Sequence, residues 1–333
     1  MNKNEIINLF KNFSQLNVLI IGDVMIDSYF FGKVDRISPE APVPIVSVEK
    51  KDNRLGGAAN VALNIKALGA NPILCAVIGN DEDGKKFNSL LKKEKLSSAG
   101  IVTSGERITT VKTRIIGNKH QVLRVDSENN HPLSKKEYTQ LFKSIANVIS
   151  KTKIDVVIFQ DYDKGVITKQ LIAEVVKFCN KNNIPTAVDP KKTNFNFYKN
   201  VTLFKPNLKE LKEGLNIDIS PSNSKAIEMA IDQLNVTLKN KITFITLSEH
   251  GVFIKNKSKK KHISAHIRNI ADVSGAGDTV ISVASLCLAL NQSIDTIAEL
   301  ANLAGGLVCE DIGVVPIDKN QLLSEAIANL IDV

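Results

Sequence analysis

The stretch Asp272-Val273-Ser274-Gly275-Ala276-Gly277-Asp278 stands directly before an apolar helical pattern over residues 279–290. Small residues at a helix N-terminus leave backbone N–H groups bare, and the helix dipole strengthens their attraction for an anion. Glycine also lets a phosphate approach the backbone closely. A carboxylate at position 278 would lie beside that phosphate, where it can take a proton from an attacking hydroxyl. The stretch therefore predicts an anion hole with an adjacent base, and a plain N-cap with a glycine turn is the alternative.

Short apolar runs alternate with helical patterns along the rest of the chain. Strands separated by helices imply βαβ units, so we expect an α/β fold with a doubly wound, mostly parallel sheet flanked by helices. Ligands bind beyond the carboxyl ends of the strands in such sheets. The expected strands cover residues 18–21, 73–78, 154–159, 185–189, 201–204 and 242–247, and the expected helices cover residues 58–68, 83–95, 135–150, 168–181, 208–214, 224–238, 277–289 and 294–311.

The chain has 333 residues, of which 43% are apolar, enough for a buried core. Its composition argues against a membrane-spanning, a secreted or a nucleic-acid-binding protein. No apolar run reaches the roughly 18–20 residues needed to span a bilayer, and the N-terminus lacks a signal peptide's apolar stretch. We therefore expect a cytoplasmic protein without a membrane partner. The net charge is +8, but aromatic residues make up only 5% and the lysines are scattered, so no nucleic-acid partner is expected. The dense lysine run at 255–261 is typical of a solvated hairpin tip.

Two segments, about 29–50 and 109–126, interrupt the alternation because they contain strand patterns without helices. Gly117-Asn118-Lys119 is a good hairpin turn between two short apolar runs. These segments predict a small second sheet, which would form a lid over a ligand cleft or a dimer surface. We expect one domain over residues 1–333 with this small β lid inserted in it.

A second glycine turn, Leu55-Gly56-Gly57-Ala58-Ala59-Asn60, opens the helix expected at 58–68. The Asn60 amide offers a donor and an acceptor to a sugar hydroxyl, whereas a tight strand-to-helix turn is the alternative. Asp23 and Asp27 follow the first expected strand, where carboxylates bind ligand hydroxyls or cap a turn.

Asn207 and Glu210 share one helical face because they are three residues apart. Their oxygens suit Mg²⁺ held through water, and an N-cap with a first-turn glutamate is the alternative. The Asp-Lys pairs at 161–164 and 189–191 indicate either charges near phosphates or surface ion pairs. Residues 79–86 have the spacing of a P-loop, but three acidic residues and the lysine at the hydroxyl position exclude that motif.

The chain resembles the ribokinase-like (PfkB) sugar kinases from about residue 18 to residue 316. The resemblance rests on three motifs in that family's order, GlyGlyAlaAlaAsn at 56–60, AsnLeuLysGlu at 207–210 and AspValSerGlyAlaGlyAsp at 272–278. Within the family, the sequence is similar to the branch that phosphorylates the anomeric hydroxyl of a seven-carbon sugar phosphate. This similarity rests on the stretches at 22–29, 36–44, 123–126, 161–165 and 247–251. Another sugar or sugar phosphate is the alternative. No HxGH motif occurs, so we expect no nucleotidyltransferase domain, and a separate nucleotidyltransferase is an expected pathway partner.

The resemblance implies ATP, Mg²⁺ and a monovalent cation such as K⁺ as ligands, and a homodimer paired through the lid. It implies that Asp278 is the catalytic base and that Gly275, Ala276 and Gly277 form the anion hole. The expected sugar-binding residues are Asp23, Asp27, Gly56, Gly57, Asn60 and Arg124. The expected nucleotide-binding residues are Asn207, Glu210, Thr246, Ser248, Gly251 and Asn302. The expected metal sites are Asn207 with Glu210 for Mg²⁺ through water, and Asp272 with Ser274 for the monovalent cation.

Three residues depart from the family's pattern: Ser274 and Lys205 each replace a threonine, and Gln160 replaces a serine. Lys205 and Gln160 are expected near the nucleotide, where they would change ATP affinity. The distal phosphate of a sugar phosphate needs cations, and arginine binds phosphate bidentately. The candidates are Arg36, Arg54, Lys112, Arg114, Arg124, Lys164 and Lys191.

Overall fold

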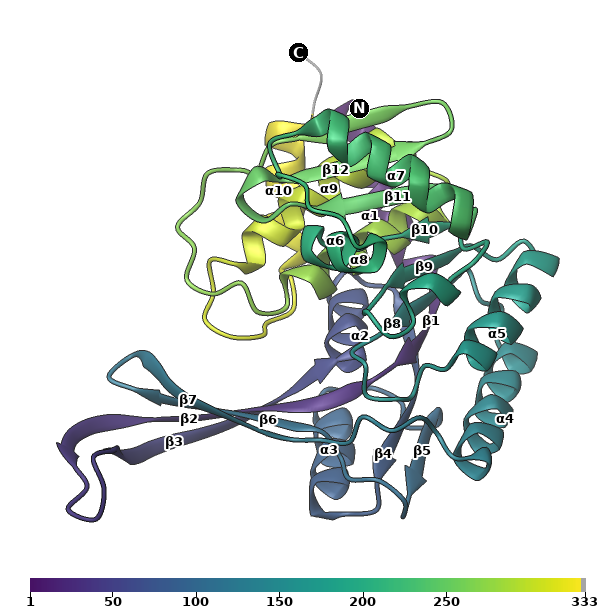
Figure 1. Ribbon diagram of the computed structural model, residues 1–333. Helices are drawn as coiled ribbons and strands as arrows, with labels where there is room; N and C mark the ends of the chain where they lie inside the picture. Colours follow the sequence, from purple (N-terminus) through teal and green to yellow (C-terminus); the bar gives the residue numbers. More distant parts are fainter. Residues whose placement is uncertain (331–333) are drawn as a thin grey trace.

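The computed structural model describes residues 1–330 and builds its larger part around a nine-stranded sheet (Figure 1). Its strands are β1 (Asn17–Gly22), β4 (Asn71–Gly79), β5 (Ile101–Ser104), β8 (Val156–Gln160), β9 (Thr186–Asp189), β10 (Leu203–Phe204), β11 (Ile242–Thr246), β12 (Val252–Asn256) and β13 (Lys260–Ile263). Their order is β13-β12-β11-β10-β9-β8-β1-β4-β5. The seven strands from β5 to β11 are parallel, and β12 and β13 form an antiparallel edge. The expected doubly wound, mostly parallel α/β fold is confirmed.

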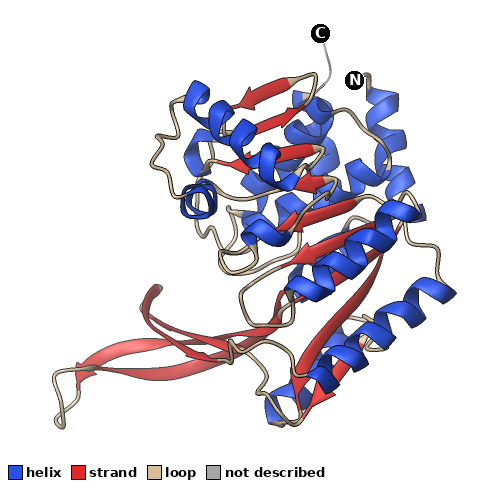
Figure 2. Ribbon diagram, turned by 45° about the vertical axis from the view of Figure 1, so that its right-hand side comes forward, coloured by secondary structure: helices blue, strands red, loops and turns tan. Residues whose placement is uncertain are grey.

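Helices flank this sheet, as the alternating pattern predicts (Figure 2). They are α1 (Lys3–Asn12), α2 (Ala58–Ala67), α3 (Glu82–Lys93), α4 (Lys135–Lys151), α5 (Lys169–Lys181), α6 (Leu208–Leu215), α7 (Ser224–Leu238), α8 (Ala276–Ala289), α9 (Ile294–Val308) and α10 (Lys319–Asn329). The expectations missed α1, α10 and β5. A signal for α1 was present, because the Asn2 and Glu5 side chains form a capping box at its start.

The second sheet consists of β2 (Val24–Ile37), β3 (Pro44–Gly57), β6 (Val111–Gly117) and β7 (His120–Ser127), in the order β3-β2-β6-β7. It extends away from the larger sheet as a long twisted ribbon (Figure 1). The expected limits of 29–50 were too narrow, because β2 and β3 have 14 residues each. The hairpin turn is confirmed: Asn118 and Lys119 have φ of 52° and 70°, the left-handed values that a two-residue hairpin requires.

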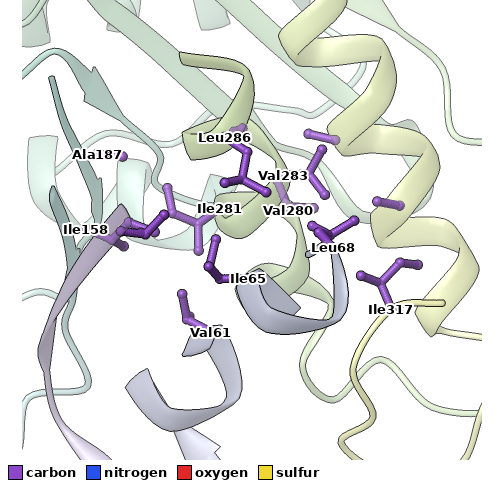
Figure 3. Close-up of a cluster of buried hydrophobic side chains, with 14 of the residues drawn as sticks. Val61, Ile65, Leu68, Ile158, Ala187, Val280, Ile281, Val283, Leu286 and Ile317 are labelled. Carbon is purple, nitrogen blue, oxygen red and sulfur yellow. The ribbon is translucent and has the colours of Figure 1, made fainter. Parts of the chain in front are cut away.

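Helices α2 and α8 pack together against the large sheet in one apolar cluster (Figure 3). Val61 and Ile65 of α2 lie near Ile281 of α8, and Ile158 of β8 lies beside Ile281. All four side chains are fully buried. This packing brings the N-termini of α2 and α8 together beyond the carboxyl ends of the strands.

Several smaller features of residues 1–330 bear on the sequence patterns. The lysine run lies in the β12–β13 hairpin, where Lys255 pairs with Glu228 and Asp232 of α7. The four cysteines are buried and form no disulfide. Among the described helices, none is both long and apolar enough to cross a membrane. The turn before α3 is an N-cap, because Asp81 accepts a hydrogen bond from Gly84 N.

Candidate active site

The carboxylate of Asp278 lies in the first turn of α8 and is held by three side chains from other parts of the chain. Its Oδ1 accepts hydrogen bonds from Tyr162 Oη at 2.7 Å and from Gln160 Nε2 at 2.9 Å. Its Oδ2 accepts one from Asn60 Nδ2 at 2.8 Å. A carboxylate oxygen has two lone pairs, so Oδ1 is filled and Oδ2 keeps one lone pair for a further donor.

Asp278 is only 4% exposed, and its surroundings change its acidity. Burial raises the pKa of Asp278 to about 6, because a charged carboxylate loses its hydration there. Hydrogen bonds from Asn60 and Tyr162 act in the opposite direction and lower the pKa. A base of this pKa is ionised at neutral pH and still basic enough to accept a proton in a reaction.

The turn Gly275-Ala276-Gly277 opens α8 as the motif predicts. Gly275 is the N-cap with φ of 86°, a conformation that L side chains rarely adopt, and a Cβ there would lie 3.1 Å from Asn60 Nδ2. No side chain caps the helix at this end. Ala276 N donates to Val273 O at 3.3 Å, and no side chain accepts from the first N–H groups of the helix. The turn therefore has the geometry of an anion site beside Asp278, and its role as the anion hole stays a prediction.

Three polar residues lie near the base, although the sequence patterns did not assign them to it: Gln160, Asp189 and Lys205. Gln160 Nε2 contacts both Asp278 and Asp189, and Lys205 pairs with Asp189 at 3.1 Å. Lys205 is 2% exposed, and its Nζ would lie 3.9 Å from a Cβ on Gly277. The Gln160 amide contacts the base directly, and its expected place near the nucleotide stays a prediction. The signal for this group was the shared position of 160, 189 and 205 at the ends of neighbouring parallel strands.

Asp23 has a different environment from the one expected of a sugar-binding carboxylate. It is 1% exposed, and its oxygens accept hydrogen bonds from the backbone N–H groups of Tyr162, Lys164 and Val166 at 2.8–3.1 Å. Burial raises the pKa of Asp23, and these backbone hydrogen bonds oppose the rise. The carboxylate thus holds the loop that positions Tyr162, and direct sugar binding by Asp23 stays a prediction.

Asp27 lies on β2, where the lid joins the larger sheet, and its carboxylate forms an ion pair with Arg114 of β6. A Cβ on Gly56 would lie 2.0 Å from Asp27 Oδ2, and one on Gly57 would lie 2.5 Å from Asp23 O. The two glycines therefore let β3 pass directly beside both aspartates. Arg124 of the edge strand β7 is the register partner of Arg114, but its side chain is 52% exposed and pairs with Asp126 rather than with Asp27.

Asn207 and Glu210 form the N-terminal capping box of α6. Asn207 Oδ1 accepts from Glu210 N at 2.8 Å, and Glu210 Oε2 accepts from Asn207 N at 2.8 Å. Glu210 Oε1 also pairs with Lys191. The capping alternative is therefore confirmed. Asn207 Oδ1 and Glu210 Oε2 each keep a second lone pair, so a role in binding Mg²⁺ stays a prediction.

The other residues expected at the nucleotide lie around the end of β11. Thr246 bridges to Asn207, and a Cβ on Gly251, which has φ of 82°, would lie 2.0 Å from Ile263 O. Ser248 follows with φ of 54°. Asn302 of α9 donates to Ser264 O at 2.9 Å and so holds the segment after β13. Their contact with a nucleotide stays a prediction.

Asp272 links the loop before α8 to the loop after α9. Its Oδ1 accepts from Ser274 N at 2.9 Å, and its Oδ2 accepts from Gly313 N at 3.0 Å. Asp272 and Ser274 are thus close together, as expected, and a monovalent cation beside them stays a prediction.

Known proteins of similar sequence cover most of the chain. Residues 15–320 match the description "pfkB family carbohydrate kinase". The chain is 37% identical over 308 residues to "Bifunctional protein HldE" of Methylobacillus flagellatus, covering 92% of this chain and 62% of that protein. It is also 37% identical over 298 residues to the protein of the same name from Helicobacter pylori, covering 89% and 63%. The chain spans about three fifths of the length of these relatives.

Solved structures share the fold at low sequence identity. Phosphofructokinase-2 from Escherichia coli in complex with potassium has a TM-score of 0.78 at 18% identity, over 95% of this chain and 99% of that chain. Ribokinase from Arabidopsis thaliana complexed with ribose and ATP has a TM-score of 0.69 at 16% identity, over 92% and 98%. The shared ribokinase-like fold and the family match over residues 15–320 agree. The chain belongs to the PfkB family of carbohydrate kinases.

Proposed function

We propose that this chain transfers the γ-phosphoryl group of ATP to the anomeric hydroxyl of D-glycero-β-D-manno-heptose 7-phosphate. The product would be the 1,7-bisphosphate, an intermediate of ADP-heptose biosynthesis for the lipopolysaccharide core. The observation that carries the proposal is the buried Asp278 carboxylate, which has one lone pair unfilled beside the N-terminus of α8. The choice of sugar rests on the motifs at 22–29, 36–44 and 123–126.

The reaction assigns a separate task to each part of the site. Asp278 Oδ2 accepts the proton of the anomeric hydroxyl, and the hydroxyl oxygen forms a bond to the γ-phosphorus. The bond from that phosphorus to the β–γ bridging oxygen breaks, and ADP leaves. The backbone N–H groups of residues 275–277 stabilise the negative charge on the phosphoryl oxygens. Such a reaction needs positioning and charge neutralisation more than covalent work by the protein.

The nucleotide is proposed to lie against Asn207, Glu210, Thr246, Ser248, Gly251 and Asn302. Residues 1–330 contain no cluster of three or more His, Cys, Asp or Glu side chains that would hold a metal. Asn207 and Glu210 nevertheless fit Mg²⁺, because Mg²⁺ bound to ATP needs only one or two protein oxygens and keeps several waters. Mg²⁺ supplies charge neutralisation on the phosphates when bound. Asp272 and Ser274 are the proposed K⁺ site.

The proposal is tested by ³¹P NMR of the protein mixed with Mg-ATP and the heptose 7-phosphate, with Asp278→Asn in parallel. We expect a new anomeric phosphate signal that the variant forms far more slowly. Turnover of fructose 6-phosphate or ribose, but not of the heptose phosphate, would keep the kinase and reject the choice of sugar. No turnover of any sugar would reject the proposed role of the site.

The lid is also proposed to pair two copies of the chain. The strand registers place Phe30, Ile115 and Leu123 in one row on the face opposite Arg114. Leu123 and its neighbour Val125 are 53% and 51% exposed, which is costly for apolar side chains in water. A mass measurement in solution should give a dimer, and a monomer at all concentrations would contradict the pairing. Action in the cytoplasm, and a separate nucleotidyltransferase that uses the product, stay predictions.

A further inference from the structure

The seven cationic side chains that are candidates to hold the distal phosphate of a sugar phosphate differ in whether a carboxylate already pairs with them. Five of them form ion pairs within 4.0 Å, namely Arg54 with Asp52, Arg114 with Asp27, Arg124 with Asp126, Lys164 with Glu128 and Lys191 with Glu210. Arg36 is exposed near the far end of β2. Lys112 is half-buried, and within residues 1–330 no carboxylate lies within ion-pairing distance of it.

Lys112 belongs to the lid, and its side chain lies close to the reacting centre. It is on β6 and pairs in register with Asp27 of β2, so both side chains lie on the same face of the lid. Its Nζ is 5.4 Å from the centre of the Tyr162 ring, and the hydroxyl of that tyrosine is 2.7 Å from Asp278. One tyrosine side chain therefore separates the Lys112 ammonium from the base.

The environment of Lys112 favours the arrival of an anion. Burial lowers the pKa of Lys112, and the nearby Lys164 lowers it further. Asp27, Glu128 and Asp126 oppose this shift from a distance without contacting the ammonium. A desolvated cation that has an aromatic ring but no carboxylate as its partner is costly, so a phosphate that contacts it would regain much of the lost interaction.

We propose that Lys112 binds the distal phosphate of the sugar substrate and thereby selects phosphorylated over unphosphorylated sugars. This inference rests on the proposed function. The reacting hydroxyl lies at Asp278 Oδ2, the sugar lies across the Tyr162 side chain, and the distal phosphate contacts the Lys112 ammonium.

The test compares steady-state kinetics of Lys112→Met, Lys112→Arg and the unchanged chain on heptose 7-phosphate and on the same heptose without its phosphate. For Lys112→Met we expect KM for the sugar phosphate to rise about 10–100-fold, the usual loss for one hydrogen bond to a charged group. Its KM for ATP and its kcat/KM for the unphosphorylated heptose should stay within about twofold. Lys112→Arg keeps the charge and should recover most of the affinity.

Lys33→Met is the matched control, because Lys33 is an exposed lid lysine that pairs with Glu49. It should behave as the unchanged chain on both sugars. If the unchanged chain turns over neither sugar, the proposed function fails and this inference fails with it. If that chain is active but Lys112→Met keeps the same preference for the phosphorylated sugar, only the role of Lys112 is overturned. Equal losses on both sugars, or a lower melting temperature that explains the loss, would also overturn it.

Discussion

Two buried carboxylates lie on either side of the loop at 160–166, and they are held in different ways. Asp23 accepts three backbone N–H groups of that loop. Asp278 accepts hydrogen bonds from the side chains of Asn60, Gln160 and Tyr162. Tyr162 joins the two, because its N–H donates to Asp23 and its hydroxyl donates to Asp278. A carboxylate bound by backbone fixes a loop, whereas one bound by side chains with a lone pair left over is available for chemistry.

The strongest way to break this comparison is to neutralise the base. Asp278→Asn should lower kcat by about 10²–10⁴-fold, the usual contribution of a general base, while KM for ATP changes little. Steady-state kinetics at saturating sugar phosphate measures this. A variant that keeps more than a tenth of the activity would show that Asp278 is not the base.

The same variant also tests the burial of Asp278 through stability. Its pKa is raised above 3.8 to about 6, so the folded state holds a proton that the unfolded state releases between these values. The stabilisation is therefore present below about pH 3.8 and is lost as the pH rises through about 6. The free energy of unfolding of the unchanged chain, relative to Asp278→Asn, should fall across this window in urea titrations. An unchanged difference would mean that the carboxylate is not desolvated.

Asp23→Asn should affect stability first. The substitution replaces one of the two carboxylate oxygens by an NH₂ group, which donates and cannot accept. At least one of the three backbone N–H groups therefore loses its hydrogen-bond partner. Such a loss costs about 1–3 kcal/mol. Chemical denaturation should show this decrease in the free energy of unfolding. The catalytic rate should fall only to the extent that the substitution displaces Tyr162 from Asp278. Full stability with a rate loss as large as that of Asp278→Asn would reverse the roles of the two aspartates.

Tyr162→Phe is the smallest change and sharpens the comparison. Loss of the hydroxyl removes a hydrogen bond that lowers the pKa of Asp278, so that pKa should rise above about 6. The acid limb of the kcat profile should move to higher pH, with a rate loss of about 3–10-fold at neutral pH, since one hydrogen bond contributes about 0.5–1.5 kcal/mol. An unmoved acid limb would remove Tyr162 from the positioning of the base.

The sequence predicts the main sheet and the α8 turn because their signals are local. Apolar runs bounded by turns mark the buried strands, and the glycine-rich turn before α8 needs only adjacent residues. The true length of the lid strands is hidden for a different reason. Residues 49–53 are Glu-Lys-Lys-Asp-Asn, and a strand with polar residues on both faces has no alternation of apolar and polar side chains.

The contacts of Asp278 are also hidden, because they join distant segments. Asn60 and Asp278 are 218 positions apart, and Gln160 and Tyr162 reach the base from a loop whose shape depends on Asp23. Asp163 and Gly165 of that loop have positive φ, and the sequence shows neither this conformation nor the direction of the tyrosine. Only the ends of neighbouring strands indicated that these residues would meet.

The titration of Asp278 itself tests the central claim most directly. The protein is labelled with [γ-¹³C]aspartate, and the resonance that is absent from the spectrum of Asp278→Asn is followed from pH 4 to pH 8. Its midpoint is predicted to lie near pH 6 and to coincide with the acid limb of kcat/KM. A midpoint at or below pH 4, as for an aspartate in water, would contradict a buried base held by Asn60, Gln160 and Tyr162.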